Sequence, residues 1–169
     1  ISTVPPSAVT NAAVRLGRKK SPGRLLVHYM QPHLPPVDED LDLDLNLDFR
    51  DGWGANNPWR AIEKGDVDSS VVKNAYSSNL SPVVDEVNKL LNNLSSEKVI
   101  ITADHGNMLG EMGRWGHFRE NAIHPGVRMV PWWEVSASDL QTLNAEDNVK
   151  QTETDLLSRQ QKLRALGYV

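Results

Sequence analysis

Two apolar runs in the chain predict β-strands that end close to histidines. Residues 99–102 read Val-Ile-Ile-Thr, a run without polar alternation that is typical of a strand covered on both faces. Residues 24–30, bounded by a Pro-Gly pair and by a later proline, predict a second buried strand. The pair Asp104-His105 follows the first run and His33 follows the second, so each predicted strand presents polar groups at its carboxyl end.

Apolar residues recur at near-helical spacing from Ser69 to Leu94 and predict a helix between the two strands. Pro82 lies inside this pattern and predicts a kink or a break into two helices. Asp66 or Ser69 is suited to cap the start of the helix. Strand, helix and strand in this order form a βαβ unit, which requires parallel pairing and a right-handed crossover. The expected fold class is therefore α/β, in one domain.

The flanking segments are interpreted from composition and spacing. Residues 1–23 form a poorly defined lead-in with a short helix expected at 11–16, and residues 35–67 form an acidic insertion. Asp and Leu alternate in that insertion, as in an edge strand or a lid; a calcium site is the alternative, although the spacing matches no EF-hand loop. A further strand is expected at 128–135, interrupted or edged by a proline, and a helix at 148–166.

Composition narrows the function classes. The chain has 169 residues, 39% of them hydrophobic and 24% charged, which is ordinary for a globular domain with a sizeable core. A net charge of −4 gives no reason to expect nucleic-acid binding, which usually requires a basic face. The absence of cysteine excludes disulfides and thiolate metal sites. No apolar run approaches the length of a membrane span, and no signal peptide is visible.

The pair Asp104-His105 is the first candidate for chemistry. It follows a strand directly, and in open α/β sheets ligands bind at the carboxyl ends of strands. A carboxylate oxygen and imidazole nitrogens suit Zn, Mn or a similar divalent ion. The alternative is a carboxylate that caps a turn beside a histidine satisfied by hydrogen bonds. Position after a strand favours metal ligation.

Several motifs in order along the chain resemble the alkaline phosphatase superfamily, and within it the sulfatase-like branch. The core of the resemblance is T-A-D-H-G-N-x-L-G-E at 102–111, followed by Gly-His and by H-P-G-V-R-M-V-P-W at 124–132. Similar pieces are H-Y-x-x-P-H at 28–33, A-Y-x-x-N-L-x-x-V-x-D-E-V at 75–87 and L-R-x-L-G-Y at 163–168. The resemblance implies the C-terminal portion of an alkaline-phosphatase-like domain, with a mainly parallel sheet and helices on both faces.

The resemblance also implies roles for named residues. Asp104 and His105 would hold a divalent metal, with Zn, Mn, Ca and Mg all open. His117 would contact the oxyanion of the ester as an imidazolium, or complete a second metal site as in two-metal branches; a loop histidine facing water is the alternative. His33 would bind the transferred group and act as general acid toward the leaving oxygen. Glu111 could orient His105 or His117, or could simply be a solvated surface carboxylate.

The nucleophile expected from the resemblance, a Thr, Ser or formylglycine preceded by acidic metal ligands, is not recognisable in the sequence. The chain therefore resembles the C-terminal half of such an enzyme and is expected to be inactive alone. The parent activity would be metal-dependent hydrolysis of a sulfate or phosphate ester of a small molecule or glycan. Alternatives are a phosphosugar mutase or phosphotransferase of the same superfamily, and a non-catalytic binding module that retains the fold. The residues do not separate sulfate from phosphate.

Overall fold

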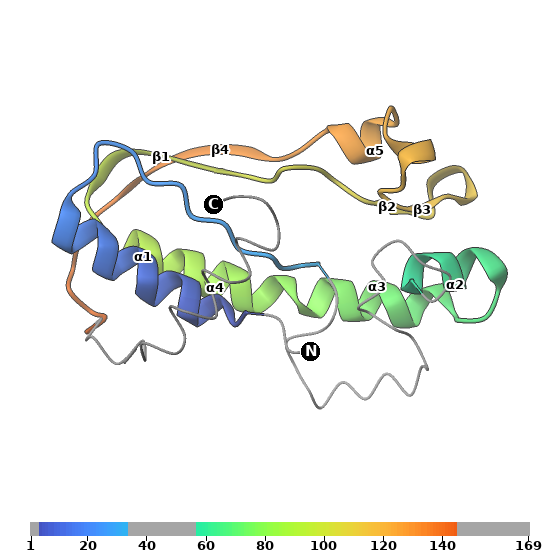
Figure 1. The fold of residues 1–169 in the computed structure, drawn as a ribbon, viewed down its shortest axis with the longest axis horizontal. Coiled ribbons are helices and arrows are strands. Elements are labelled where there is room, and N and C mark those ends of the chain that lie inside the picture. The colour runs from blue at the N-terminus through green and yellow to red at the C-terminus, as the bar shows by residue number, and fades with distance from the viewer. Residues whose placement is uncertain (1–3, 34–56, 145–169) are drawn as a thin grey trace, which may run out of the picture.

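The computed structural model describes residues 4–33 and 57–144, in which helices and strands lie in two layers (Figure 1). The four longer helices form one layer, with α1 packed against α4 at one end and α2 and α3 at the other. Their bounds are α1 (Pro6–Lys20), α2 (Pro58–Lys64), α3 (Ser69–Ser78) and α4 (Leu80–Leu91). The second layer holds the strands β1 (Ser96–Thr102) and β4 (Trp132–Ala137). The short elements at the α2–α3 end are β2 (Met108–Leu109), β3 (Trp115–Gly116), α5 (Pro125–Arg128) and the single-turn helices Glu111–Gly113 and Arg119–Asn121.

Helix α1 is longer than the short helix expected at 11–16. Pro6 occupies its first turn, where the missing N–H would have no helical partner and the fixed φ favours the helical conformation. Its last turn carries three consecutive basic residues, Arg18 to Lys20, whose charges interact favourably with the helix dipole. The proline pair that reads as part of an irregular lead-in therefore starts a helix.

The helix expected from Ser69 to Leu94 is broken in two, as Pro82 predicts. Helices α3 and α4 meet at Asn79, and Pro82 lies in the first turn of α4, where a proline is tolerated. The cap of α3 is Asp68, whose carboxylate accepts a hydrogen bond from the Ser70 amide at 2.7 Å. Asp66 and Ser69 do not form this cap.

Strand β1 ends at Thr102, with Ala103 between it and the Asp-His pair, as predicted. It pairs antiparallel with β4, Val99 lying opposite Val135 and Thr102 opposite Trp132. In the described part of the chain the strands form two antiparallel two-stranded sheets, β1–β4 and β2–β3, and residues 24–30 are assigned to no strand. The mainly parallel sheet stays a prediction.

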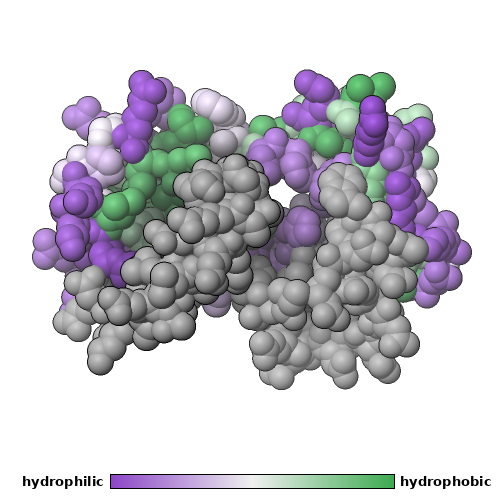
Figure 2. Space-filling view, in the orientation of Figure 1, coloured by the Kyte–Doolittle hydropathy of each residue, from purple (hydrophilic) through white to green (hydrophobic). Residues whose placement is uncertain are grey.

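The expectation that both apolar runs are buried on two faces is wrong for the described residues. Val99 to Ile101 are half-buried, and Leu26 in the other run is 93% exposed. Exposure instead alternates over residues 26–30: Tyr29 is half-buried, its hydroxyl 2.9 Å from the Thr10 hydroxyl of α1, while His28 is exposed. The physical reason is that, among the described residues, helices cover one side of these segments and leave the other uncovered. Figure 2 shows apolar side chains at the surface on the upper part of the viewed face.

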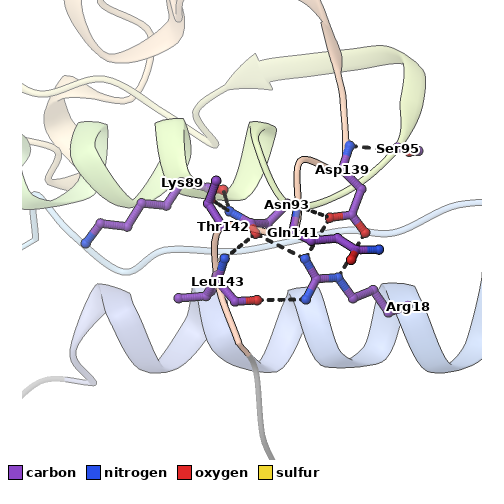
Figure 3. Close-up of polar contacts among 8 residues, drawn as sticks. All are labelled: Arg18, Lys89, Asn93, Ser95, Asp139, Gln141, Thr142 and Leu143. Carbon is purple, nitrogen blue, oxygen red and sulfur yellow. Dashed lines mark hydrogen bonds and ion pairs between the residues drawn. The ribbon is translucent and has the colours of Figure 1, made fainter.

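A polar cluster joins the segment after β4 to α1 and α4 (Figure 3). Arg18 binds both carboxylate oxygens of Asp139, at 2.9 and 2.7 Å. Asn93 is completely buried, and its Oδ1 accepts from the Leu143 amide at 2.7 Å and from Arg18 at 3.1 Å. Its Nδ2 donates to the Lys89 carbonyl and the Thr142 hydroxyl, both at 2.8 Å. Asn93 is thus fully satisfied and connects three segments.

The acidic alternation between 38 and 51, the helix expected at 148–166 and the L-R-x-L-G-Y ending all lie outside the described residues. Within the described residues, none of the helices is long and apolar enough to cross a membrane.

Replacing Asn93 by alanine should lower the free energy of unfolding by about 1–3 kcal/mol, because a buried side chain loses several hydrogen bonds at once. The neighbouring Asn92 is exposed, so Asn92→Ala should change stability by less than about 0.5 kcal/mol. Urea unfolding of the two variants and the wild type measures the difference. Equal stability of the two variants would show that the cluster does not stabilise the fold.

Candidate functional site

Three histidines from distant parts of the sequence converge beside Asp104. His33 follows the extended segment 24–30, His105 follows β1 and His117 follows β3. The ring centroids of His105 and His117 are 4.2 Å apart, and those of His33 and His117 are 6.1 Å apart. The structure therefore brings together four of the five site residues expected from the sequence.

The β2–β3 hairpin returns His117 to the Asp-His pair. Met108 lies opposite Gly116 in this hairpin. Gly116 has a φ of +68°, and a Cβ there would lie 3.1 Å from both Trp59 and Phe118. Any other residue would strain both the backbone and the packing. The hairpin rests here on the hydrophobic cluster formed by α2, α3 and this loop, with buried members Trp59, Val72, Ala75 and Phe118.

A second close approach fixes the turn after the pair. A Cβ on Gly106 would lie 2.2 Å from the carbonyl oxygen of Gly126, which is backbone and cannot move aside. The Gly106 amide also donates to the Val127 carbonyl at 2.7 Å. The backbone at His105 is thus held against α5, and only glycine fits at 106.

Asp104 and His105 present donors suited to a divalent cation. The His105 Nδ1 lies 2.9 Å from the Gly106 carbonyl oxygen, which can only accept, so Nδ1 carries the proton and Nε2 carries the lone pair. This Nε2 lies 3.8 Å from Asp104 Oδ2, while Asp104 Oδ1 accepts from the His105 amide at 2.9 Å. A histidine whose Nδ1–H is bonded to a carbonyl is the usual arrangement of an Nε2 metal ligand. Both side chains are exposed, and together they fit a metal.

The described residues contain no group of three or more His, Cys, Asp or Glu side chains placed to hold a metal ion. The expectation that Asp104 and His105 form part of a metal site therefore stays a prediction.

The environment of His117 favours its neutral form. Burial is the main cause that lowers the pKa of His117 from 6.5 to about 4, and repulsion from His105 and His33 adds to it. The charge of Asp104 raises the pKa of His117, but by less than burial and the two histidines lower it. The imidazolium form expected from the resemblance is therefore disfavoured near neutral pH.

Asn107 and Tyr76 are site residues to which sequence reasoning assigned no role. Asn107 Oδ1 lies 2.7 Å from His117 Nδ1, and the side chain of Asn107 also bonds the Tyr76 hydroxyl. The position of Asn107, two residues after His105 in a motif with functional neighbours, was the available signal. Nothing in the sequence indicated that a helical tyrosine reaches the same loop.

The break between α3 and α4 helps to place His33. Asn79, buried at this break, donates from Nδ2 to the His33 carbonyl at 3.3 Å and to the Pro32 carbonyl at 3.5 Å. The His33 amide donates to the Met30 carbonyl at 3.1 Å, which closes the turn. His33 is exposed and thus accessible to a ligand.

The remaining candidates have local structural partners. Glu111 accepts a hydrogen bond from the Leu109 amide at 2.6 Å, and backbone hydrogen bonds are the main cause that lowers its pKa. Its expected role in orienting His105 or His117 stays a prediction. His124 caps α5, its Nδ1 accepting from the Gly126 amide at 3.0 Å.

Comparisons with protein-family models, with curated proteins and with solved structures find no match to this chain. Function must therefore be argued from the side chains of the site.

The depressed pKa of His117 predicts a pH-dependent stability. Between pH 6.5 and about 4 the unfolded chain binds a proton on this histidine that the folded chain does not. The free energy of unfolding should therefore fall as the pH drops through this window, by at most about 3 kcal/mol from this group.

Urea unfolding at pH 7 and pH 5, with a chelator present, measures the loss. His117→Gln should show a smaller loss between the two pH values than the wild type, whatever its stability at pH 7. His28→Gln, at an exposed position, is the matched control and should lose as much as the wild type. An unchanged loss in His117→Gln would show that this group does not determine the effect.

Proposed function

We propose that this chain carries the metal-binding and leaving-group side of a hydrolase that acts on phosphate or sulfate esters. The observation that carries the proposal is the convergence of His33, His105 and His117 beside Asp104, on a scaffold of two glycine-dependent close contacts. The motifs that resemble the sulfatase-like branch of the alkaline phosphatase superfamily contribute all four residues. The substrate class that follows is a phosphate or sulfate ester of a small molecule or a glycan.

Asp104 and His105 hold the divalent ion in this proposal. Their oxygen and nitrogen donors fit Zn, Mn, Ca or Mg to different degrees, with Zn and Mn accepting the mixed pair most readily. A bound divalent ion would offset the charge of the ester oxygens and activate a nucleophile. The carbonyl of Gly106 keeps the His105 ring in the tautomer that presents Nε2.

His33 and His117 face the transferred group. His33 is exposed and can carry a proton to a leaving oxygen, as a general acid must. His117 is half-buried, and its ring lies near both of the other two rings.

Metal binding by the chain tests the proposal most directly. Isothermal titration with Zn²⁺ and Mn²⁺ should show binding that weakens roughly tenfold or more in Asp104→Asn and in His105→Gln, since even indirect ligand partners contribute factors of this size. The controls are Asp85→Asn on the exposed face of α4 and His28→Gln, which should bind as the wild type does.

The reaction itself is tested with aryl phosphate and aryl sulfate in any preparation of the protein that hydrolyses them. Chelation and Asp104→Asn should each abolish release of the aryl alcohol. Full turnover by metal-free protein would contradict the proposal. Absence of any metal binding by the wild-type chain would instead favour a binding module without this chemistry.

A further inference from the structure

We infer that Asn107, anchored by Tyr76, is a positioning residue that sets His117 in the Nδ1–H tautomer and so makes its Nε2 a hydrogen-bond acceptor. The tautomer is a property of the chain without metal or substrate. The role of His117 Nε2 toward a substrate rests on the proposed function.

The hydrogen bond from His117 to Asn107 determines where the proton sits. The Nδ1 of His117 lies 2.7 Å from Oδ1 of Asn107. An amide oxygen has lone pairs and no hydrogen, so it can only accept. The imidazole nitrogen must therefore donate, and in a neutral ring the other nitrogen, Nε2, then carries the lone pair.

Tyr76 holds the amide of Asn107 in the required orientation. Burial raises the pKa of the Tyr76 hydroxyl, and a hydrogen bond from the Asn107 side chain partly offsets this rise. Because the amide oxygen of Asn107 already lies 2.7 Å from His117 Nδ1, the NH₂ group is the part of this side chain left to donate to the Tyr76 hydroxyl. With the NH₂ group toward Tyr76, the amide oxygen points toward His117.

The anchor itself is packed against the hydrophobic core. Tyr76 lies on α3 and packs edge-on against Trp59, with ring centroids 5.5 Å apart. Trp59 belongs to the buried cluster beneath the β2–β3 hairpin, and Tyr76 packs against that cluster. The residue that holds the amide of Asn107 in its orientation is therefore part of the packing around the hydrophobic core.

The tautomer changes the role that His117 can perform. The resemblance implied an imidazolium that donates to an ester oxyanion. A neutral ring fixed with Nδ1–H toward Asn107 has no proton at Nε2 to donate. It accepts instead, and the ligand atom that matches it is an O–H group, such as water or a protonated phosphate oxygen. A fully deprotonated oxyanion would meet a lone pair and be disfavoured.

NMR of the chain labelled with ¹⁵N in its imidazole rings tests the inference. Two-bond ¹H–¹⁵N correlation spectra at pH 7.5, with a chelator present, distinguish the two tautomers of each ring. The wild type should show His117 as Nδ1–H. Asn107→Leu removes the acceptor and should shift His117 toward Nε2–H, the form that predominates in free histidine.

Asn107→Asp keeps an acceptor oxygen at the same place and should retain Nδ1–H, which separates the hydrogen bond from the mere presence of a side chain. Tyr76→Phe should give a mixture of tautomers, because the amide loses its anchor. The His105 signal serves as an internal control, since its Nδ1–H bonds Gly106 and should stay unchanged in every variant. If Asn107→Leu does not fold, Asn107→Ala makes the same comparison.

An Nε2–H signal for His117 in the wild type, or an unchanged Nδ1–H signal in both apolar variants at Asn107, would overturn the inference. These outcomes are independent of the metal titration. Loss of metal binding with the expected tautomers rejects the hydrolase proposal alone, and normal metal binding with the wrong tautomer rejects the positioning role alone.

Discussion

The contact of the Gly116 backbone with Trp59 and Phe118 is the constraint on which the site depends. It presses the β2–β3 hairpin onto the hydrophobic cluster of α2 and α3 without an intervening side chain. Only with the hairpin at this depth does His117 reach His105. Glycine is required twice over, by the positive φ and by the contact, and a substitution here would displace the histidine together with the hairpin.

The same cluster determines the electrostatics of the site. Because the hairpin is seated on apolar side chains, His117 is withdrawn from water, and the neighbouring rings of His33 and His105 penalise a further positive charge. Tyr76, packed on that cluster, reaches Asn107. Burial therefore favours a neutral His117, and the hydrogen bond to Asn107 selects which nitrogen of the neutral ring carries the proton. Asp104 and His105 lie at the exposed side of the site, where two donors can meet a cation.

Some local elements were predictable from the sequence, and their pairing was not. The end of β1 before Asp104 followed from the apolar run, and the break between α3 and α4 followed from Pro82. The burial of 24–30 was mispredicted. An apolar run shows that a segment can be buried, whereas its actual exposure depends on which other elements pack over it. The β1–β4 pairing depends on contacts between residues far apart in sequence, for which periodicity carries no information.

The site residues divide in the same way. Asp104, His105 and His117 could be selected because their side chains carry chemistry and follow a strand or a glycine. Asn107 and Tyr76 could not, because an amide and a phenol act here only through another ring, and this requires their orientation in space. The difference has a physical basis. A ligand residue is recognised by what its atoms bind, whereas a positioning residue is recognised by which of its atoms faces which neighbour. For His117 that orientation decides whether the neutral ring donates or accepts at Nε2, and, in the proposed hydrolase, which protonation state of an ester it would match.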